Sequence, residues 1–562
     1  MPPRIVLGQS DFVSLRDEGA LYVDKSGFVA EILNAPAQVL LYPRPRRFGK
    51  TLNLSMAAAF LERGPDRTAL FSDLEIWRDQ DARAHFQRYP VIRLTFKDLK
   101  QRSWAEARTA IEILLAAEVA RHAAALADPR LDAGIKRRLL DIREGSGELT
   151  RALLDLSEAL SLHHGEKVVL LIDEYDAGVL TAWEHGYYDE AVAFFRTLLS
   201  PGLKDNPHLF RGVLTGILRV ARESMFSGLN NVRVFSLLHP RTGEFFGFTD
   251  GEVSALLDAH ERREAVEEVR SWYNGYHFGE ATVYNPWSIL CFLSEPGASP
   301  APYWLNTSEN GLVRSLLLDS ADLHADVLTL IAGGSVEARV EESVPLRDLH
   351  GASVWSLFLF GGYLTAERVT QVRGRVRAGL RIPNFEVRTL WEDTFLEWME
   401  RLAGALDPLH AAILGGDARQ TEEILGRMLL RHVSVHDVAR DQDEVFYHAF
   451  VLGLLVSLEG THLVRSNREV GHGRADVQII PRSPGRSGVV LEFKRRQAGK
   501  DLESCAEEAL RQIQDRVYTA ELVAAGASPI RTMGIAFSGK DVVVRAGSGL
   551  SDELSHGPIV HR

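Results

Sequence analysis

Two carboxylates and a lysine near the C-terminus have the types and spacing that metal-dependent phosphodiester cleavage requires. Asp476 lies at the start of the strand-like run GRADVQII, and Glu492 and Lys494 stand two residues apart in VVLEFK, after a Pro/Gly/Ser-rich turn. Side chains at i and i+2 of a strand point to the same face, and a hairpin would bring Asp476 opposite that face. The pattern is short, and an edge strand with alternating charged and apolar residues is the structural alternative.

These residues suit a divalent metal site. Carboxylates are hard oxygen ligands for Mg²⁺ or Mn²⁺, so Asp476 and Glu492 are the expected ligands, with the backbone carbonyl of Phe493 as another. The metal would polarise the scissile phosphate and lower the pKa of the attacking water. Lys494 would position that water or offset the charge that develops in the transition state.

A second distinctive segment, RPRRFGKT at residues 44–51, follows the apolar run QVLLY and precedes the helix-like LNLSMAAAFLE. A helix that begins after such a loop points its N–H groups and positive dipole end at an anion. Lys50 would reach the β- and γ-phosphates of ATP, and the Thr51 hydroxyl would ligate Mg²⁺. The usual pattern has Gly where this chain has Arg44, so we expect a less open cradle, to which Arg46 or Arg47 adds charge. The binding segment would comprise Arg46, Arg47, Phe48, Gly49, Lys50, Thr51 and Leu52.

The run VVLLIDEYD at residues 168–176 places two acids at the end of an apolar strand. Ligands of open α/β sheets bind at the carboxyl ends of the strands. Asp173 would hold Mg²⁺, usually through a water, and Glu174 would orient or activate an attacking water. An acidic turn after a strand and a Thr-capped turn after QVLLY are common structural features. Their occurrence together, in this order, favours a nucleotide site.

The segments LYVDKSGFV, RPRRFGKTL, VVLLIDEYD and LTGILRVARESMFSGLNN resemble the bacterial AAA-ATPase-like family with a degenerate P-loop. WYNGYHFG, VYNPWSIL, YWLNTS and FGGYLT are also similar to segments of that family, and the resemblance covers most of residues 5–400. It implies that Thr215 lies in a sensor position near the γ-phosphate. It also implies charge-stabilising roles for Arg219 and Arg222, for which helix-surface arginines are the structural alternative.

The segments GRAD, LEFK and ALRQIQDRVY resemble the PD-(D/E)XK nuclease superfamily over about residues 420–545, with GRAD in place of the Pro-Asp of its name. The resemblance implies a helix, a mixed sheet and a further helix. It implies that Glu469, upstream of Asp476, joins the metal shell. It also implies that Gln512 acts as a polar helper from the flanking helix, which includes Tyr518, and that the substrate is DNA or RNA.

Apolar strands alternate with helical stretches through the first 240 residues, and the strands are expected at 38–42, 89–96, 167–172 and 211–216. Such alternation is typical of a mostly parallel sheet with helices on both faces. One helix has Ile111, Leu114, Leu115 and Val119 on one face. Beyond it we expect a mainly helical region rich in Trp and Tyr, then returning strands, a helix over 502–524 and a strand over 531–537. The fold class is α/β, with a P-loop NTPase domain at 1–248, a helical lid or linker at 249–415 and a mixed α/β PD-(D/E)XK-type domain at 416–562.

Composition sets outer limits. The two cysteines, Cys291 and Cys505, allow no disulfide framework and suggest no zinc site, which favours a reducing, cytoplasmic setting. No secretory signal is visible, and no apolar run approaches the ~18 residues of a membrane span. The net charge of −12 argues against wholesale coating by nucleic acid but allows a local basic groove. The basic stretch 482–500 is one place for such a groove, although a solvated surface is its simpler interpretation.

Three functional hypotheses follow. In the leading one, ATP binding or hydrolysis regulates a C-terminal nuclease for DNA or RNA, and a role in defence against mobile elements is suggested by family analogy alone. In the second, the protein is a nucleotide-dependent switch whose nuclease fold only grips nucleic acid. In the third, it is an NTPase with an inactive C-terminal domain. The retention of both carboxylates and the lysine favours the first. A homo-oligomer is expected if the nucleotide site lies between subunits.

Overall fold

The computed structural model describes residues 2–220, 231–295, 297–305, 311–319, 323–331, 333–349, 351–403, 406–432, 443–455, 458, 460–470, 473–496, 499–515 and 519–547. The chain forms two compact units. The first comprises Met1–Ser308 and Glu337–Val387, and the second Glu309–Val336 and Arg388–Arg562. No helix among the described residues is long and apolar enough to cross a membrane.

A five-stranded parallel sheet forms the centre of the first unit. Its strands are β1 (Val39–Pro43), β2 (Val91–Thr95), β3 (Val168–Asp173), β4 (Leu209–Gly216) and β5 (Val232–Val234), in the order β2-β3-β4-β1-β5. The first four confirm the strands expected from the apolar runs. The sequence patterns do not predict β5, because its three residues are only partly buried and too few to show a period.

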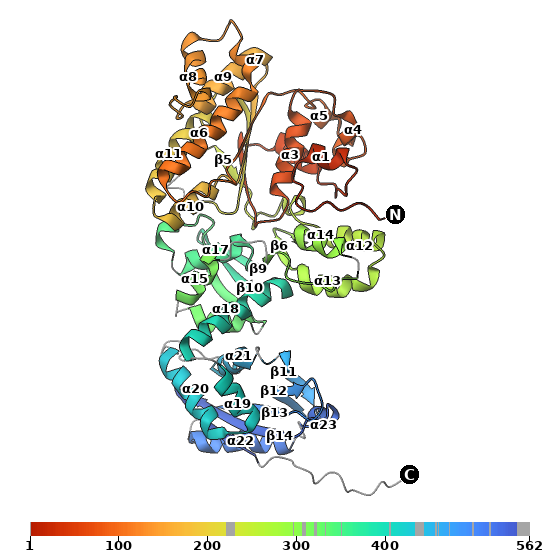
Figure 1. The fold of residues 1–562 in the computed structure, drawn as a ribbon, viewed down its shortest axis with the longest axis vertical. Coiled ribbons are helices and arrows are strands. Elements are labelled where there is room, and N and C mark those ends of the chain that lie inside the picture. The colour runs from red at the N-terminus through yellow and green to blue at the C-terminus, as the bar shows by residue number, and fades with distance from the viewer. Residues whose placement is uncertain are drawn as a thin grey trace. The chain divides into compact units, whose positions relative to one another are not determined.

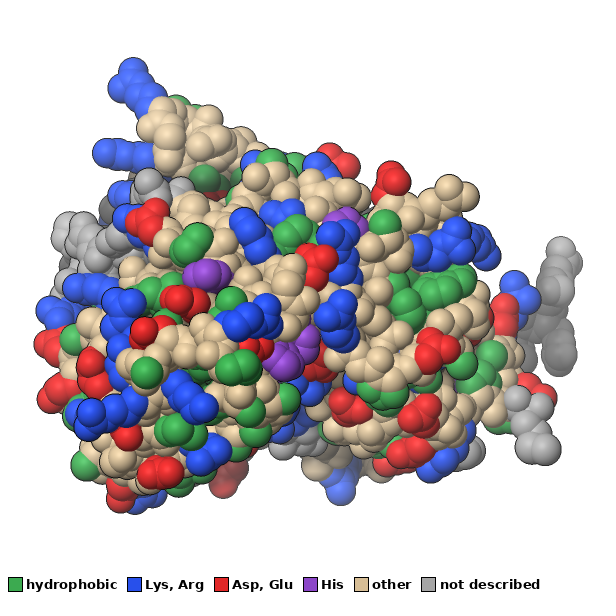
Figure 2. All heavy atoms as spheres, turned by 90° about the horizontal axis from the view of Figure 1, so that it is seen from above, with side chains coloured by type: hydrophobic (Ala, Val, Ile, Leu, Met, Phe, Trp, Pro, Cys, Tyr) green, Lys and Arg blue, Asp and Glu red, His purple; other side chains and the backbone are tan. Residues whose placement is uncertain are grey.

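Helices cover both faces of this sheet (Figure 1). On one side lie α1 (Phe12–Asp17), α3 (Lys50–Leu61), α4 (Thr68–Phe71) and α5 (Gln80–Arg83). On the other lie α6 (Trp104–Arg121), α7 (Ala123–Leu126), α8 (Ala133–Arg143), α9 (Ala152–His164) and α11 (Tyr188–Leu203). Two further helices are α2 (Gly27–Asn34) and α10 (Ala177–His185). Figure 2 views the end of the unit where α7 and α8 lie, and there Lys and Arg are interspersed with Asp and Glu.

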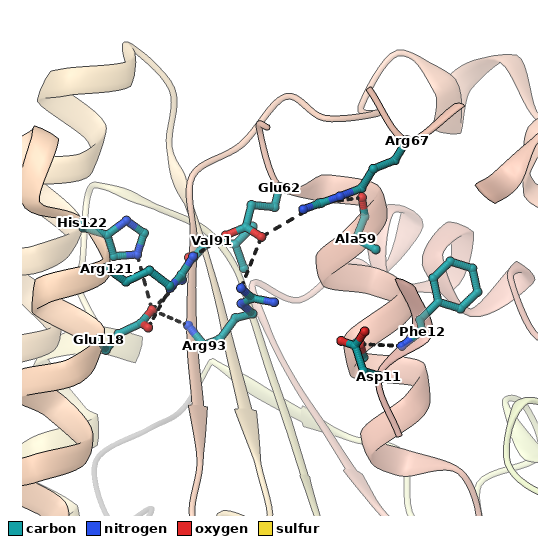
Figure 3. A network of polar contacts seen from close by, with 11 residues as sticks. Asp11, Phe12, Ala59, Glu62, Arg67, Val91, Arg93, Glu118, Arg121 and His122 are labelled. Carbon is teal, nitrogen blue, oxygen red and sulfur yellow. Dashed lines mark hydrogen bonds and ion pairs between the residues drawn. The ribbon is translucent and has the colours of Figure 1, made fainter. Parts of the chain in front are cut away.

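Side chains of α6 complete the free edge of β2 (Figure 3). The Arg93 N–H donates to Glu118 over 2.7 Å, and Arg121 Nη2 donates to the Val91 carbonyl over 2.5 Å. Arg121 also bonds Glu118 and Glu62, so one guanidinium links α6 to the end of α3. An open strand edge invites pairing with another chain. Here two backbone groups of the edge, the Val91 carbonyl and the Arg93 N–H, are bonded from within the unit.

The rest of the first unit combines helices with short strands. Its helices are α12 (Asp250–Ala259), α13 (Val266–Tyr273), α14 (Pro286–Ser294) and α17 (Ala352–Gly361). A hairpin of β6 (Tyr276–Phe278) and β7 (Ala281–Val283) and a sheet of β8 (Val336–Val340), β9 (Thr365–Val372) and β10 (Arg375–Arg381), in the order β8-β10-β9, accompany them. The helical character of the middle region was expected, whereas these strands were not.

The second unit builds a mixed sheet in the order β11-β12-β13-β14-β15. The strands are β11 (His462–Val470), β12 (Gly473–Pro481), β13 (Gly488–Arg495), β14 (Ile530–Ser538) and β15 (Asp541–Ala546). Only the pair β13–β14 is parallel among the described pairs. The helices are α15 (Gly311–Asp319), α16 (His324–Ile331), α18 (Phe385–Ala403, from its fourth residue), α19 (Asp407–Gly415), α20 (Ala418–His432), α21 (Asp443–Leu455), α22 (Leu502–Asp515) and α23 (Ala520–Ala524). The helix expected over 502–524 is therefore described as two, α22 and α23.

Candidate functional sites

Three polar side chains meet at the carboxyl edge of the parallel sheet. Thr51 Oγ1 donates a hydrogen bond to Asp173 Oδ2 over 2.6 Å, and Thr215 Oγ1 donates to Asp173 Oδ1 over 2.5 Å. The three residues come from the start of α3 and the ends of β3 and β4, and parallel strands end at the same edge. Asp173 is only 5% exposed. It is therefore a buried carboxylate, and both of its oxygens accept a hydrogen bond. The structure thus brings together the three residues that the sequence predicts at one nucleotide site.

The loop before α3 leaves backbone donors at the helix N-terminus. Gly49 precedes the helix with φ +78°, a left-handed conformation that favours glycine. It has no side chain to cap the helix, and the N–H groups of Lys50, Thr51 and Leu52 make no hydrogen bond with the residues that the structure describes. The first N–H groups of a helix together form an anion site. This end of α3 therefore has the donors that a phosphate group requires.

Lys50 folds back over the loop. Its Nζ donates to the carbonyls of Arg44 and Pro45 over 2.9 and 2.7 Å, and the side chain is buried. Burial lowers the pKa of Lys50, while Glu174, Asp173 and Asp176 oppose that shift. A buried ammonium gains from any further anion that approaches it. Lys50 is thus suited to a phosphate at the start of α3.

Arg44, which replaces the usual glycine, is directed into the core. Its guanidinium donates to the Phe235 carbonyl over 2.6 Å and to Thr242 Oγ1 over 3.2 Å, and it stacks on Phe246 at 4.9 Å. The side chain is fully buried, and burial lowers its pKa to about 9. The bulk of Arg44 is accommodated by the segment after β5. It ties that segment to the loop.

Aromatic and glycine residues of the middle region contact the four loop residues 45–48. The pairs are Pro45 with Gly362, Arg46 with Trp304, Arg47 with Trp287, and Phe48 with Tyr276 and Phe278. A Cβ on Gly362 would lie 2.8 Å from Pro45, so this approach requires glycine. The partners come from FGGYLT, YWLNTS, VYNPWSIL and WYNGYHFG, four of the segments that carry the family resemblance. Aromatic enrichment marks this region in the sequence, but the loop as its partner is visible only in the fold.

A buried carboxylate holds one of these partners. Glu386 accepts from the backbone N–H of Trp304 over 2.6 Å and from Ser288 Oγ over 2.8 Å, and Trp304 Nε1 in turn donates to the Arg46 carbonyl over 3.2 Å. Burial raises the pKa of Glu386 to about 7, although both hydrogen bonds act to lower it. Sequence patterns gave no signal for Glu386. It lies 82 residues beyond Trp304.

The acidic segment after β3 also shapes the end of β4. Glu174 has φ +49° and is half-buried, and its carboxylate makes no hydrogen bond or ion pair within the part of the chain that the structure describes. Asp176 accepts from the N–H groups of Ile217 and Leu218 over 2.9 and 2.7 Å. Burial raises the pKa of Asp176 to about 6, against the effect of these bonds. Arg219 follows, with Nη1 4.0 Å from Glu342, while Arg222 lies outside the described residues.

The second site lies in the sheet of the second unit. The register Val477↔Leu491 between β12 and β13 sets Asp476 opposite Glu492. The Asp476 N–H donates to Glu492 Oε2 over 3.3 Å, and the Phe493 N–H donates to Asp476 Oδ2 over 2.7 Å. Lys494 Nζ lies 3.7 Å from Glu492 Oε1. The hairpin expected from GRADVQII and VVLEFK therefore brings the two acids and the lysine together.

Gln512 joins this cluster from α22. Its Nε2 donates a hydrogen bond to Glu492 Oε1. The helix lies close to the sheet because Gly534, the β14 neighbour of Glu492, has no side chain; a Cβ there would be 2.2 Å from the Ala506 carbonyl oxygen. The buried residues Cys505, Ala506, Ala509 and Ile513 form the helix face that packs here. The small side chains of Ala506 and Ala509 at Gly534 let Gln512 reach the carboxylate.

Two further expectations fall partly outside the described residues. Glu469 lies on β11, where its backbone pairs with Arg474, two residues before Asp476; its side chain and Tyr518 are not described. Within the described part of the chain, no group of three or more His, Cys, Asp or Glu residues could hold a metal. The oxygen donors at this site are those of Asp476, Glu492 and the backbone carbonyl of Phe493.

The basic stretch 482–500 divides into two groups along β13. Arg482 and Arg486 precede β13, whereas Lys494, Arg495 and Lys500 lie at or after its end. Six strand residues, Gly488 to Phe493, lie between the two groups and separate them by about 20 Å. Lys500 Nζ also pairs with Glu508 over 2.6 Å. The cations of this stretch therefore lie toward the two ends of β13, and a basic groove here stays a prediction.

Comparisons with known proteins match each site to a different family. Residues 6–226 match the family described as "Predicted AAA-ATPase", and residues 442–546 match the PD-(D/E)XK nuclease superfamily. An uncharacterized protein in the vnfD 5′ region of Azotobacter chroococcum mcd 1 is 27% identical over 555 residues, which are 95% of this chain and 96% of that protein. A Walker-type ATPase of Pyrococcus abyssi is 14% identical with a TM-score of 0.34, over 66% of this chain and 96% of that chain. The first matched range contains Lys50, Asp173 and Thr215, and the second contains Asp476, Glu492 and Gln512.

Proposed function

We propose that this chain, which joins a predicted AAA-ATPase-like domain to a C-terminal PD-(D/E)XK nuclease superfamily domain, binds and hydrolyses ATP and cleaves DNA or RNA in a metal-dependent reaction. The observation that carries the proposal is that each matched range holds a cluster of the residue types its chemistry needs. Thr51 and Thr215 bond Asp173 in one range, and Gln512 and Lys494 contact Glu492 in the other.

In the ATPase domain the loop residues Arg46 to Leu52 would bind the phosphates. The open N–H groups at the start of α3 would donate hydrogen bonds to the β- and γ-phosphates, with Lys50 as the nearest cation. The Thr51 hydroxyl and the Asp173 carboxylate lie 2.6 Å apart and are oxygen donors of the kind that Mg²⁺ prefers, so they fit the ion. Mg²⁺ bound there would neutralise phosphate charge.

Residues around Asp173 would catalyse ATP hydrolysis. Glu174 has an unengaged carboxylate next to Asp173, which suits a group that orients a water. Thr215, which bonds Asp173, would sense the γ-phosphate through the same carboxylate. Arg219 is held to Glu342 only by a 4.0 Å contact. Once released from Glu342, the Arg219 side chain would stabilise the negative charge that develops on the transferred phosphate.

In the nuclease domain Asp476, Glu492 and the Phe493 carbonyl would hold Mg²⁺ or Mn²⁺. The fit rests on two carboxylates on adjacent strands, one of them with a side chain only 2% exposed. The metal would polarise the scissile phosphate. Lys494 would offset the developing negative charge, Gln512 would orient Glu492, and Glu469 would complete the shell from β11.

A cleavage panel tests the proposal. Purified full-length protein is incubated with double- and single-stranded DNA and RNA, with Mg²⁺, Mn²⁺ or EDTA, and with or without ATP. Divalent-dependent cleavage that is lost in Glu492→Gln and altered by ATP is the expected result. Cleavage of no substrate, with metal-independent binding of nucleic acid, would overturn the nuclease assignment in favour of a nucleotide-dependent switch.

ATP hydrolysis is separated from binding by Glu174→Gln. This variant should bind ATP as the wild type does and release phosphate on the order of 100-fold more slowly, since it loses the group that orients the water. Undiminished phosphate release would remove Glu174 from the mechanism. Phosphate release by a wild type that cleaves no nucleic acid would favour an NTPase with an inactive C-terminal domain.

A further inference from the structure

The hairpin of β9 and β10 carries an exposed, arginine-rich ribbon. Residues 368–375 and Arg377 are all exposed, and Val376 is half-buried. The strands pair antiparallel, and the turn uses Arg373 and Gly374 with φ +50° and +75°. Two successive positive φ values are typical of the tight turns that join twisted two-stranded ribbons. We call residues 368–377 the arginine ribbon.

The charge of this hairpin is opposite to that of the chain. Residues 365–381 contain five arginines and one glutamate, whereas the net charge of the chain is −12. At the base of the hairpin Arg381 pairs with Glu367 over 2.7 Å, and Arg368 approaches Glu337 at 3.7 Å. The side chains of Arg373, Arg375 and Arg377 make no ion pair or hydrogen bond with the residues that the structure describes. Three neighbouring cations therefore remain available to an anionic partner.

The register gives these cations a regular arrangement. Arg375 pairs with Val372 and Arg377 with Thr370, so the two arginines lie on one face of the ribbon. Residues at i and i+2 of a strand lie about 7 Å apart, about the axial rise of two nucleotides in one strand of a duplex. The register shifts between Arg377 and Gly379, opposite Arg368 with φ +45°, and such a bulge increases the twist of a ribbon.

We propose that the arginine ribbon binds double-stranded DNA through its phosphate backbone. The inference rests on the proposed function, because it supplies the substrate class on which a nuclease domain would act. A twisted two-stranded ribbon fits the major groove of B-form DNA, about 12 Å wide, whereas the deep and narrow groove of duplex RNA does not admit it. Val372, 58% exposed on the same face, is suited to apolar contact with thymine methyl groups.

The test removes three charges from the ribbon and three from elsewhere. Arg373→Gln/Arg375→Gln/Arg377→Gln is compared with a control, Arg137→Gln/Arg143→Gln/Arg263→Gln. The control arginines belong to the same unit and have exposed side chains that approach acids at 3.5–3.9 Å. Binding of a fluorescent DNA duplex is measured by anisotropy in EDTA, without ATP, from low to high salt. The ribbon variant should bind at least about tenfold more weakly at low salt, with the salt slope reduced by about three, whereas the control should resemble the wild type.

Two further arms sharpen the result. The variant Arg373→Lys/Arg375→Lys/Arg377→Lys keeps the charges and should retain most of the affinity for DNA. It distinguishes a loss of charge from a loss of the folded hairpin. Duplex RNA and phosphatidylserine vesicles should bind more weakly than the DNA duplex and should be less affected by the ribbon variant. Equal losses in ribbon and control variants, or equal dependence of RNA or vesicles on the ribbon, would overturn the inference.

The outcomes separate this inference from the proposed function. A wild type that cleaves nothing, but loses DNA affinity with the ribbon charges, would contradict the nuclease assignment and leave the ribbon assignment intact. A protein that cleaves DNA, with duplex affinity and KM unchanged in the ribbon variant, would contradict the ribbon assignment alone.

Discussion

Gln512 donates a hydrogen bond to a Glu492 carboxylate whose side chain is only 2% exposed. The bond joins α22 to β13, and it depends on the absence of a side chain at Gly534. A buried carboxylate that loses a hydrogen-bond donor retains its desolvation cost. Gln512 is therefore placed to hold Glu492 in one orientation.

Replacing Gln512 by Leu should weaken the proposed nuclease site without removing one of its proposed metal ligands. We expect cleavage to fall about tenfold and the Mg²⁺ concentration for half-maximal rate to rise, because Glu492 loses its orientation. The melting temperature in EDTA should fall, since an unsatisfied buried acceptor costs about 1–3 kcal/mol. Gln512→Glu places a carboxylate at the same position, where it repels Glu492. Cleavage should fall further in this variant than in Gln512→Leu. Unchanged cleavage and Mg²⁺ dependence in Gln512→Leu would show that the amide only fills space.

The acids and the lysine of this site should separate metal binding from chemistry. Asp476→Asn and Glu492→Gln should lose Mg²⁺ affinity and cleavage, while Lys494→Met should bind Mg²⁺ normally and cleave on the order of 100-fold more slowly. The amide variants should melt no lower than wild type in EDTA, because adjacent carboxylates repel one another without the metal. Calorimetry with Mg²⁺, single-turnover cleavage and thermal melts measure these effects. Early unfolding of both amide variants, with no divalent-dependent cleavage by the wild type, would make the residues structural.

At the proposed nucleotide site, Thr51 and Lys50 should affect ATP binding differently. Lys50→Ala removes a charge-assisted contact and should weaken ATP binding about 10- to 100-fold with or without Mg²⁺. Thr51→Val removes the hydroxyl that lies 2.6 Å from Asp173 and should weaken mainly Mg²⁺-dependent binding, whereas Thr51→Ser should behave as wild type. Isothermal titration with ATP, with and without Mg²⁺, distinguishes the two. Equal ATP affinity in wild type and Lys50→Ala would place the phosphates elsewhere.

Glu386 should give the first unit a pH-dependent stability. Burial raises its pKa to about 7, against about 4.5 in an unfolded chain, so the folded state holds the proton more tightly between these values. The stabilisation is present below about pH 4.5 and is lost as pH rises through about 7, by about 3 kcal/mol in all. The nearby groups Tyr273, Tyr276, Tyr303 and Cys291 all have raised pKa values and do not titrate in this window.

The Glu386→Gln variant isolates this effect, because an amide oxygen can still accept from Trp304 and Ser288. Urea unfolding of wild type and variant is followed between pH 4.5 and 7.5. As pH rises, the free energy of unfolding of the wild type should fall relative to that of the variant. Parallel pH profiles for the two proteins would show that Glu386 is ionised throughout.

The sequence alone determined much of both sites. Residue types and the alternation of side chains along strands are enough to predict which residues share a face or an edge. Thr51 and Asp173 each stand directly at the end of a helix or strand signal, and parallel strands share a carboxyl edge, so their meeting could be predicted. Glu492 and Lys494 share a face because strand side chains alternate with period two. Domain limits at 248 and 415 stay predictions, as do the roles of individual site residues.

Only the tertiary structure decided which distant residues complete these sites. The strand order puts β4 beside β1 and β3, which brings Thr215 to Asp173, and no local pattern encodes that order. Trp304 and Glu386 are 82 residues apart, yet they meet beside the loop that contains Arg46. Period and composition indicate which face of an element is buried, but not what buries it. The partner is selected by side-chain shape across the whole core, as the fit of α22 at Gly534 illustrates.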